Sequence, residues 1–499
     1  MALWQNIPFV CILLPLGSAA MTSVLKPRLA RVWTLLALGI VFSLSVLLTV
    51  LMTRYGQSYT YMMGHFPAPW GNEIRAGLLE AVTAAFFSLI MLLSLLGGQR
   101  KLEEHINEGK QSLYCVMLLL LCAALMAQVY TNDIFTAYVF VEIMTISACA
   151  LIAARNRGRT LVAATRYMMM NLLGSGLFLL GIILLYDLTG HLLMSNIRAA
   201  VWQLHATGAY HEPLTVVVAL MTIGLCVKSA LFPFHTWVPD AYGYSTPTSA
   251  AVLSSLVSKG YIFLLVKLIY RVIGVEVFAA TGMMDVLFVF ALTGMVMGSI
   301  SAIRQNDIRR MIAFSSVAQI GYVYMGIGLG TEAGMVAAMF HVFSHAVCKS
   351  MLFLASGGLA DASGNSKRFR DLRGAGYRSK MAGVAFTVGA LSMIGFPFLG
   401  GFASKLNFAL SAMAAGGTRM ALVLGALVIS TWLNTLYFMK TVITLYRKPA
   451  EDAVCDRTRG RRGAAFTVAL AAFTAVNLGV GLFAQPLIEA ITRGLGMFA

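Results

Sequence analysis

The chain consists mainly of long apolar stretches separated by short polar connections. Each stretch has the length of about 20 residues that a helix needs to cross the hydrocarbon core of a bilayer. The stretches are rich in alanine, leucine and glycine and do not alternate apolar with polar positions, which favours a helical bundle over a membrane β-barrel. The pattern predicts an all-α integral membrane protein with about fourteen transmembrane helices, at 9–25, 32–52, 79–96, 113–130, 134–154, 166–186, 215–234, 250–270, 286–302, 311–329, 333–355, 381–413, 421–445 and 464–487.

Two of these predicted helices contain a proline that would interrupt them. Pro233 lies in KSALFPFHTW at the end of the seventh span, and Pro397 lies in GFPFLGGFASK inside the twelfth. Proline removes a backbone hydrogen bond, and a broken helix at membrane depth is tolerated where it lines a polar cavity. Such a pair in two halves of a chain is typical of an internal repeat around an ion path. We therefore expect a single polytopic membrane domain over 1–499, with a first repeat at 113–272 and a second at 284–445.

Composition supports a membrane protein. Hydrophobic residues make up 59% of the chain and charged residues only 11%, which would leave a soluble protein of 499 residues with too little polar surface. The connections are too short to hold a soluble domain. The first apolar stretch has no basic residue before it and no convincing small-residue cleavage site, so we interpret it as a retained helix.

The net charge of +17 could indicate a nucleic-acid partner, but the placement of the basic residues indicates membrane topology instead. Most of them lie in connections that follow odd-numbered helices. By the positive-inside rule these connections are cytoplasmic, which predicts that both termini lie outside the inner (plasma) membrane. We expect no nucleic-acid partner. The basic connections contain Lys26, Arg28 and Arg31; Arg100, Lys101 and Lys110; Arg155, Arg157 and Arg159; Arg304, Arg309 and Arg310; the cluster 367–380; and the cluster 447–462.

The cysteines predict no cofactor. Cys11, Cys115, Cys122, Cys149, Cys226, Cys348 and Cys455 have no paired spacing that would hold zinc or an iron-sulfur cluster. The sequence also has no glycine-rich phosphate loop. We therefore expect no metal, no cofactor and no catalytic or redox site in this chain.

Several ionisable residues lie inside the apolar stretches, where each costs about 2.5 to 3.5 kcal/mol on insertion scales. Glu142 is in the middle of the fifth span, and it is the acidic residue placed most centrally. A carboxylate and an ammonium that lie close together favour each other's charged forms, whereas desolvation favours the neutral forms, so a proton can move at modest cost. We expect Glu142 to lie within ion-pair reach of Lys228. The candidate proton-relay residues are Glu142, Lys228, Lys259, His341, His345, Lys349 and Lys405.

A purely structural role remains open for each of these residues, because buried charges in bundles often serve only as contacts between helices. His341 and His345 could be satisfied core histidines, although their intrinsic pKa suits proton transfer. Lys440 lies near the end of its span, where a lysine can extend to the membrane surface.

Several long segments resemble the antiporter-like subunits of Mrp-type sodium/proton antiporters, membrane-bound hydrogenases and respiratory complex I. The resemblance covers most of the chain. Lys405, where some complex I relatives have glutamate, favours the D-type subunits of the Mrp antiporters and the related hydrogenase subunits. The segments that carry the resemblance are NDIFTAYVFVEIM, KSALFPFHTWVPDAY, STPTSAAVLSSLVSKGYIFLLVKLIYR, QNDIRRMIAFSSVAQIGY, HVFSHAVCKSMLFLASG and GFPFLGGFASK.

The resemblance implies a fold of fourteen helices with two inverted repeats, each holding a half-channel. It also implies that Glu142 modulates Lys228, that Lys259 and the histidines bridge toward the exit, and that Lys405 is the terminal proton carrier. Two positions depart from the family pattern: Arg166 stands where many relatives have lysine, and Met381 and Ala382 stand where a proline is common.

Two classes of function follow. The first is an ion-translocating membrane subunit of a multisubunit complex, which carries protons, sodium or both and is driven by a sodium gradient or by the redox reaction of other subunits. The second is a small-solute transporter or a structural membrane subunit. A solute site would bring aromatic and amide groups together at the midplane, whereas the charges here are spread over many helices, so ion translocation is the favoured interpretation.

Overall fold

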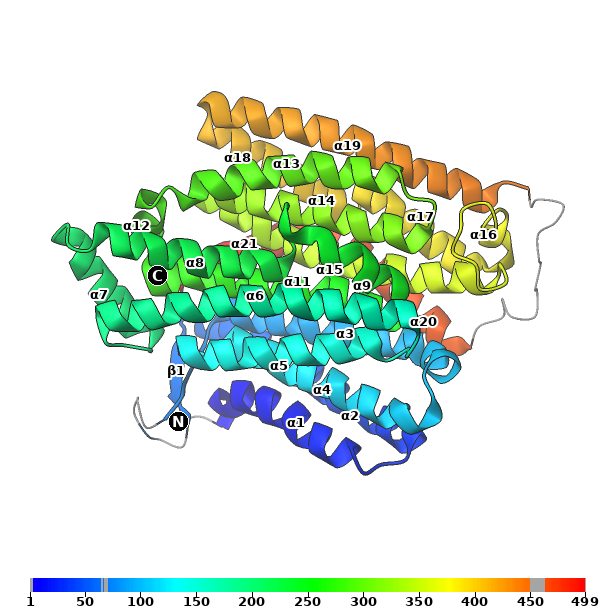
Figure 1. The fold of residues 1–499 in the computed structure, drawn as a ribbon, viewed down its shortest axis with the longest axis horizontal. Coiled ribbons are helices and arrows are strands. Elements are labelled where there is room, and N and C mark those ends of the chain that lie inside the picture. Colours follow the sequence, from blue (N-terminus) through cyan, green and yellow to red (C-terminus); the bar gives the residue numbers. More distant parts are fainter. Residues whose placement is uncertain (1–2, 64–65, 67–70, 449–462, 499) are drawn as a thin grey trace.

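The computed structural model describes residues 3–63, 66, 71–448 and 463–498. Helices dominate this part of the chain and run roughly parallel to one another in one bundle (Figure 1). Thirteen of the described helical segments are long and apolar enough to cross a membrane. The predicted class, an all-α integral membrane protein, is confirmed.

The membrane-spanning elements follow the predicted order. Their bounds are η1 (Leu3–Asn6) with α1 (Ile7–Thr22), α2 (Pro27–Tyr55), α3 (Leu78–His105), α4 (Glu108–Tyr130), α5 (Ile134–Ala153), α6 (Gly158–Thr189), α8 (His211–Ser229) with η3 (Phe234–Trp237) and α9 (Val238–Tyr244), α10 (Pro247–Val252) with η4 (Leu253–Val257), α11 (Ser258–Lys267) and η5 (Leu268–Ile273), α13 (Met283–Ile303), α14 (Ile308–Gly328), α15 (Glu332–Asp361), α17 (Lys380–Ile394) with α18 (Gly400–Ala415), α19 (Gly417–Tyr446), and α20 (Ala464–Leu482).

Two spans are interrupted, at the places where the prolines lie. The helix α8 ends at Ser229 and α9 begins at Val238, with Pro233 between them. The span expected at 381–413 consists of α17 and α18, with Pro397 in the connection. Neither half of this second span is long enough to cross the membrane alone, which is why thirteen long helices are present where fourteen spans were predicted.

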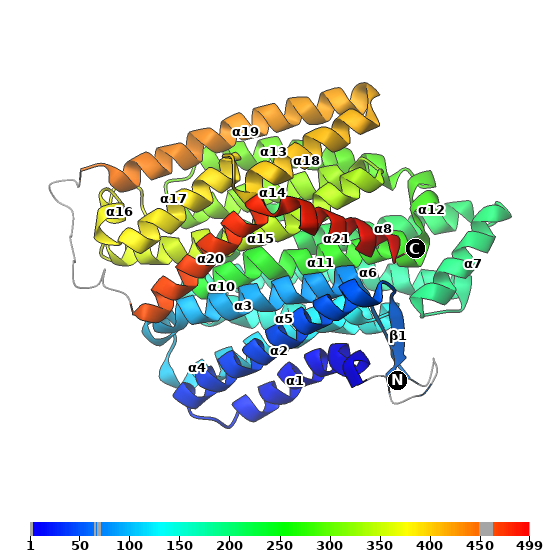
Figure 2. The ribbon, with the colours of Figure 1, turned by 180° about the vertical axis from the view of Figure 1, so that it is seen from behind.

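The two longest connections contain structure that the hydrophobic pattern did not reveal. In the first, β1 (Tyr59–Met62) pairs antiparallel with β2 (Glu73–Ala76). In the second, the short helix α7 (Met194–Ala206) lies across one end of the bundle (Figure 1). The last predicted span also bends, because α20 ends at Leu482 and α21 (Ala484–Gly496) follows in a new direction (Figure 2). The remaining short helices are α12 (Val275–Ala280) and α16 (Ala375–Arg378).

The helix α15 forms the centre of the bundle. Its residues are buried from Gly334 to Asp361, and it packs against α14, α17, α18, α20 and the segment α10–η4. A helix that is apolar and buried on every side is typical of the interior of a large bundle. Every polar side chain on this part of α15 therefore lies among other helices and away from lipid.

Candidate functional site

Glu142 and Lys228 form the first of three polar groups in the bundle. The Lys228 Nζ lies 3.8 Å from the Glu142 Oε1, so the predicted ion-pair distance is confirmed. The same ammonium donates a hydrogen bond of 2.8 Å to the Thr145 Oγ1 and lies 5.2 Å from the centre of the Tyr261 ring. We call Glu142, Thr145, Lys228 and Tyr261 the Lys228 group.

The interruption after α8 positions Lys228. Lys228 is the second-last residue of α8, and Ala230 follows shortly after it with a φ of 67°, a left-handed conformation that is costly for a residue other than glycine. On the neighbouring helix α6, a Cβ at Gly174 would lie 3.1 Å from the Lys228 Cγ. Glycine at position 174 therefore leaves room for the aliphatic part of the lysine side chain.

Lys259 and Lys349 belong to a second group deeper in the bundle. The Lys259 Nζ donates to the backbone oxygen of Ser254 over 2.6 Å, within the π-helical turn η4. The Lys349 Nζ, on α15, donates to the Ile312 carbonyl over 3.0 Å and to the Ser315 hydroxyl. The Ser254 and Ser316 hydroxyls lie 3.0 Å apart. We call these side chains, Ser254, Lys259, Ser315, Ser316 and Lys349, the Lys259 group.

His341, His345 and Lys405 belong to a third group, which is built from residues of α14, α15, α18 and α19. The His341 and His345 rings are stacked with centres 5.5 Å apart, and the Tyr322 ring stacks on His341 at 5.5 Å. The His341 Nδ1 lies 2.7 Å from the Ser404 Oγ. We call Tyr322, His341, His345, Ser404, Lys405 and Thr431 the Lys405 group.

The second interrupted helix positions Lys405. Its ammonium donates hydrogen bonds of 2.7 Å to the Ile394 carbonyl at the end of α17 and 2.9 Å to the Thr431 hydroxyl on α19. The break therefore supplies a free carbonyl, and the lysine satisfies it. Gly395, with a φ of 98°, makes the turn, and a Cβ there would lie 3.0 Å from the Lys405 Cδ. Both the backbone turn and the lysine favour glycine at this position.

All seven predicted relay residues lie within these three groups, on α5, α8, α11, α15 and α18. No direct hydrogen bond between described side chains joins one group to the next. Within the groups, several buried polar atoms have no hydrogen-bond partner in the described part of the protein: the His341 Nε2, both ring nitrogens of His345, and the Tyr322 hydroxyl. Buried polar groups are normally paired with protein or with ordered water, so these positions are suited to water.

Sequence reasoning missed a buried charged cluster at one end of the long helix 247–273. Arg271, which directly follows the predicted span at 250–270, is 2% exposed and pairs with the fully buried Glu80 on α3. Lys267, one turn earlier, donates to the carbonyls of Gln128, Val129 and Thr131 over 2.9, 2.8 and 2.6 Å. The spacing of Lys267 and Arg271, four residues apart within a continuous apolar stretch, was the available signal.

The outer face of α5 and α6 also carries charge. The Glu142 side chain is 25% exposed and lies on the same side of α5 as the exposed residues Val139 and Ile146. On α6 the Arg166 side chain is 61% exposed and lies 2.5 Å from Asp240 of α9. We call this surface the α5–α6 face. Charge facing lipid is costly, so a protein neighbour is expected to cover it.

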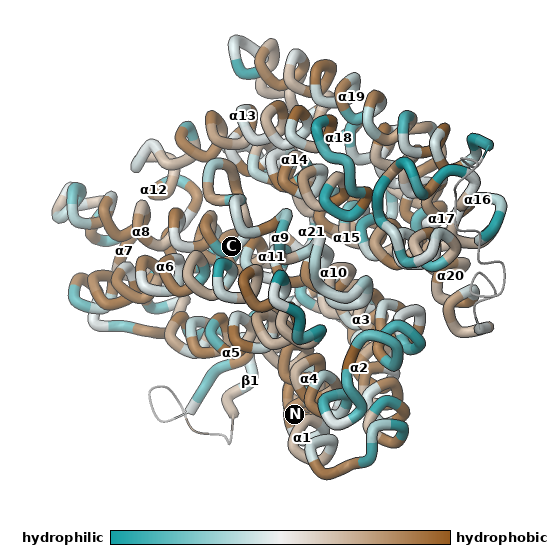
Figure 3. The backbone as a smooth tube through the Cα atoms, turned by 45° about the vertical axis from the view of Figure 1, so that its right-hand side comes forward, coloured by the Kyte–Doolittle hydropathy of each residue, from teal (hydrophilic) through white to brown (hydrophobic). Residues whose placement is uncertain are grey.

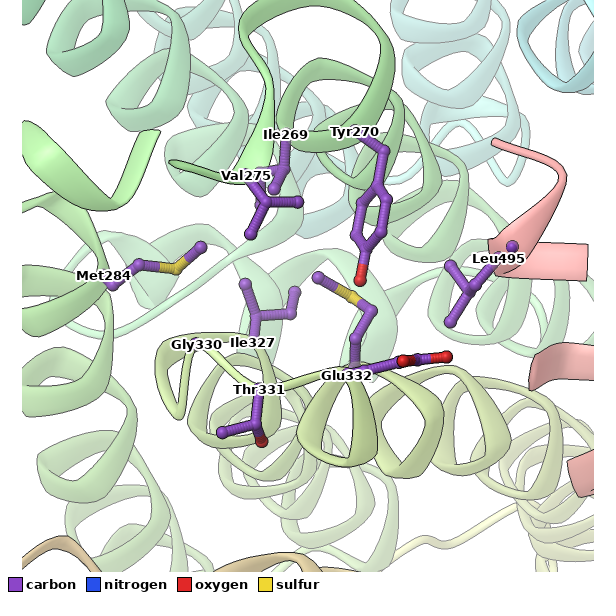
Figure 4. Close-up of a pocket in the computed structure, with 11 residues that line it drawn as sticks. Ile269, Tyr270, Val275, Met284, Ile327, Gly330, Thr331, Glu332 and Leu495 are labelled. Carbon is purple, nitrogen blue, oxygen red and sulfur yellow. The ribbon is translucent and has the colours of Figure 1, made fainter. Parts of the chain in front are cut away.

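A cavity of about 270 Å³ lies between η5, α13, α14 and α15, apart from the three groups (Figure 4). Its walls are mostly apolar side chains such as Ile269, Met284 and Ile327, with Tyr270 and Glu332 at one side. None of the predicted relay residues lines it.

Comparison with known proteins gives consistent results. A family model described as "NADH:quinone oxidoreductase/Mrp antiporter, TM" matches residues 131–431. The chain is 33% identical to the N subunit of the NADH-quinone oxidoreductase of Desulforudis audaxviator, over 91% of this chain and 89% of that protein. It is 24% identical to the D subunit of the Na(+)/H(+) antiporter of Alkalihalophilus pseudofirmus, over 86% and 83% of the two chains. A chain of the membrane-bound sulfane sulfur reductase, an archaeal respiratory membrane complex, superimposes with a TM-score of 0.88 at 26% sequence identity. The superposition covers 99% of this chain and 98% of that chain.

Proposed function

This chain belongs to the membrane-subunit family shared by NADH:quinone oxidoreductases and Mrp antiporters, and from that premise we propose that it carries protons along its buried lysines and histidines. It is a multi-pass integral membrane protein and an antiporter-like subunit of a multisubunit membrane complex. Its partners are other membrane subunits of that complex.

The observation that carries this proposal is the row of buried cations on both sides of α15. Lys228, Lys259 and Lys349 are each 0% exposed, and among the described residues only Lys228 of the three forms an ion pair, with Glu142. Ionisable side chains inside a membrane are expensive and are retained mainly where they serve an ion path. Water at the unpartnered nitrogens of the two histidines would connect the Lys259 group to the Lys405 group.

We further propose that the row is divided between two inverted repeats, at 113–272 and 284–445. The order of elements supports this. The first repeat has α4, α5, α6, the interrupted span α8–α9 and the span α10–η5, and the second has α13, α14, α15, the interrupted span α17–α18 and α19. The fourth span is interrupted in both, and each interruption lies next to a relay lysine. Lys259 and the α15 histidines would join the two halves.

The carried ion is the proton in this proposal, and sodium is the second candidate because one relative is named a Na(+)/H(+) antiporter subunit. The assembled complex in sealed vesicles tests the choice. A proton antiporter should move protons when only a sodium gradient is imposed. A redox-driven pump should move them only when electrons are supplied to its other subunits. A complex that moves protons under neither condition would contradict the proposal.

Replacing Glu142 with glutamine should slow transport without stopping it. The amide keeps the shape of the side chain but removes the negative charge 3.8 Å from the Lys228 Nζ. We expect the rate to fall roughly fivefold, which corresponds to about 1 kcal/mol on the barrier. Initial rates of pH change in vesicles measure the effect. Glu108→Gln, which changes an exposed glutamate at the start of α4, is the matched control. Equal rates for both variants would show that Glu142 does not modulate the path.

We propose that the membrane is the inner (plasma) membrane, with both termini outside and the basic connections in the cytoplasm. The positive-inside rule supports this orientation, because Arg304, Arg310 and Arg370 lie at the same end of the bundle. Figure 3 shows hydrophilic residues, in teal, in the connections near α16. The part of the predicted basic cluster at 449–462 lies outside the described residues, as does Cys455.

Cysteine labelling in intact cells tests this orientation. In a background with Cys455 replaced by serine, a cysteine at Arg370 should not react with a membrane-impermeant maleimide until the cells are opened. A cysteine at Thr207, which is exposed after α7 at the opposite end, should react from outside. The six described native cysteines are buried or half-buried and should contribute little signal. The reverse labelling pattern would invert the topology.

A further inference from the structure

A groove lies at the cytoplasmic end of α19 in the proposed orientation, against the loop that precedes α16. Its volume is about 720 Å³. The loop and α16 lie beside the last turns of α19 (Figures 1 and 2). We call it the α19 groove. It is lined by Phe369, Arg370 and Arg373 from the loop, and by Thr435, Leu436, Met439, Lys440, Ile443, Thr444 and Arg447 from the end of α19.

The charge of the α19 groove has one sign. Four of its lining residues, Arg370, Arg373, Lys440 and Arg447, are cationic and none is acidic. None of these four side chains forms an ion pair or side-chain hydrogen bond with another described residue. Elsewhere in the described structure the arginines Arg31, Arg100 and Arg419 pair with carboxylates. The groove therefore concentrates positive charge that has no counter-charge among the described side chains.

The apolar wall of the groove continues into the membrane. Ile443 is 60% and Leu436 43% exposed, and Trp432, one turn further from the groove, is 64% exposed on the same helix. Since α19 is a membrane-spanning helix that ends at Tyr446, Arg447 and the loop arginines lie at the level of lipid headgroups, and the Lys440 side chain can extend toward that level. The exposed residues Leu436 and Trp432 lie deeper, at the level of acyl chains.

We propose that the α19 groove binds an anionic phospholipid of the cytoplasmic leaflet. The four cations would hold the phosphate and any second acidic group of the head, and Leu436, Met439 and Ile443 would pack against an acyl chain. This order of charge and apolar surface along one helix matches a lipid better than it matches a free phosphate, which needs no apolar wall. It also matches a lipid better than an acidic peptide, which would not extend along the acyl-chain region.

The same helix connects the groove to the third polar group, and this connection rests on the proposed function. Thr435 lines the groove and donates a hydrogen bond of 2.9 Å to the Thr431 carbonyl. The hydroxyl of Thr431 in turn accepts from the Lys405 Nζ at 2.9 Å. A lipid that holds the end of α19 in place would therefore also hold the acceptor of Lys405, and ion transport should depend on anionic lipid.

Lipid retention by the purified complex tests the binding itself, independently of transport. Native mass spectrometry would be applied to the intact complex, delipidated and titrated with phosphatidylglycerol or with phosphatidylcholine. The natural chain should retain one phosphatidylglycerol more tightly than any phosphatidylcholine. The variant R370Q/R373Q/K440Q/R447Q should lose that molecule, with an apparent affinity at least roughly tenfold weaker.

The control removes the same number of positive charges elsewhere at the same end of the bundle. Lys26, Lys110, Arg304 and Lys380 do not line the groove, so K26Q/K110Q/R304Q/K380Q should keep the lipid. The proposal is overturned if the groove variant retains phosphatidylglycerol as the natural chain does, if both quadruple variants lose it equally, or if phosphatidylcholine binds as tightly. Unchanged retention would also be the outcome if a partner subunit fills the groove.

Transport assays separate this inference from the proposed function. In vesicles of phosphatidylcholine containing phosphatidylglycerol, the natural complex should be faster than in phosphatidylcholine alone, and the groove variant should show no such difference. Lys405→Met should abolish transport in both lipids while keeping the bound phosphatidylglycerol. Loss of lipid binding in that variant would mean that the lipid site depends on the lysine and is not the α19 groove.

Discussion

Replacing Lys228 with alanine is expected to reduce proton transport by the assembled complex to the background of protein-free vesicles. The lysine is fully buried at the break between α8 and α9, and its Nζ is the group that meets both Glu142 and Thr145. Alanine removes the only ammonium of the Lys228 group. Without this ammonium the Lys228 group has no ammonium that can pass a proton toward the Lys259 group, and the relay is interrupted at one end.

The assay should measure transport and assembly in the same preparations. Size-exclusion chromatography of the complex reports assembly, and the initial rate of pH change in vesicles reports transport. Lys380→Ala is a matched control, because Lys380 is an exposed lysine outside the three polar groups. We expect the control to transport at the natural rate. A Lys228→Ala complex that assembles and transports like the control would exclude a relay through this residue.

The variant Lys405→Met should have an equally large effect at the other end of the row. Methionine keeps an apolar side chain that packs against Gly395, so the space between α17 and α18 stays occupied. Methionine has no donor, however, for the Ile394 carbonyl and the Thr431 hydroxyl. Transport should fall to background while the complex remains assembled. The carbonyl of Ile394 would lose its partner, which costs about 1 to 3 kcal/mol and should appear as a lower melting temperature.

The two lysine variants together discriminate between the classes of function. A relay requires both ends, so each single variant should lose transport and the double variant should lose no more. If both single variants assemble normally and transport at the natural rate, the polar row serves only as contacts between helices. A structural membrane subunit would then be the better description of this chain.

The order and type of the membrane helices could be predicted because the bilayer imposes one simple requirement, a continuous apolar stretch for each span. The prolines at 233 and 397 likewise marked the interrupted helices, since a missing donor weakens any helix. The pattern could not predict the hairpin β1–β2 or the helix α7. Both lie in polar connections, where short elements are stabilised by tertiary contacts rather than by a long periodic signal.

The proximity of Glu142 and Lys228 could also be predicted, because two mid-membrane charges of opposite sign are each costly without the other. The Glu80–Arg271 pair escaped the same reasoning. Both residues lie near the ends of apolar stretches, where a charged side chain normally reaches the membrane surface, and only the packing of α3 against the long helix shows that they are enclosed. The roles of individual lysines within the row remain predictions, since position alone does not measure proton transfer.

The α5–α6 face has a consequence for the life of the chain before assembly. A newly inserted copy that has not met its neighbour leaves the Glu142 carboxylate, in the middle of its span, partly exposed to acyl chains. The energetic cost of that exposure disappears when a neighbouring subunit covers the face. The charge that serves the working complex thus also distinguishes an orphan copy from an assembled one, and we expect membrane quality control to degrade unpartnered copies faster than copies in which Glu142 is replaced by glutamine.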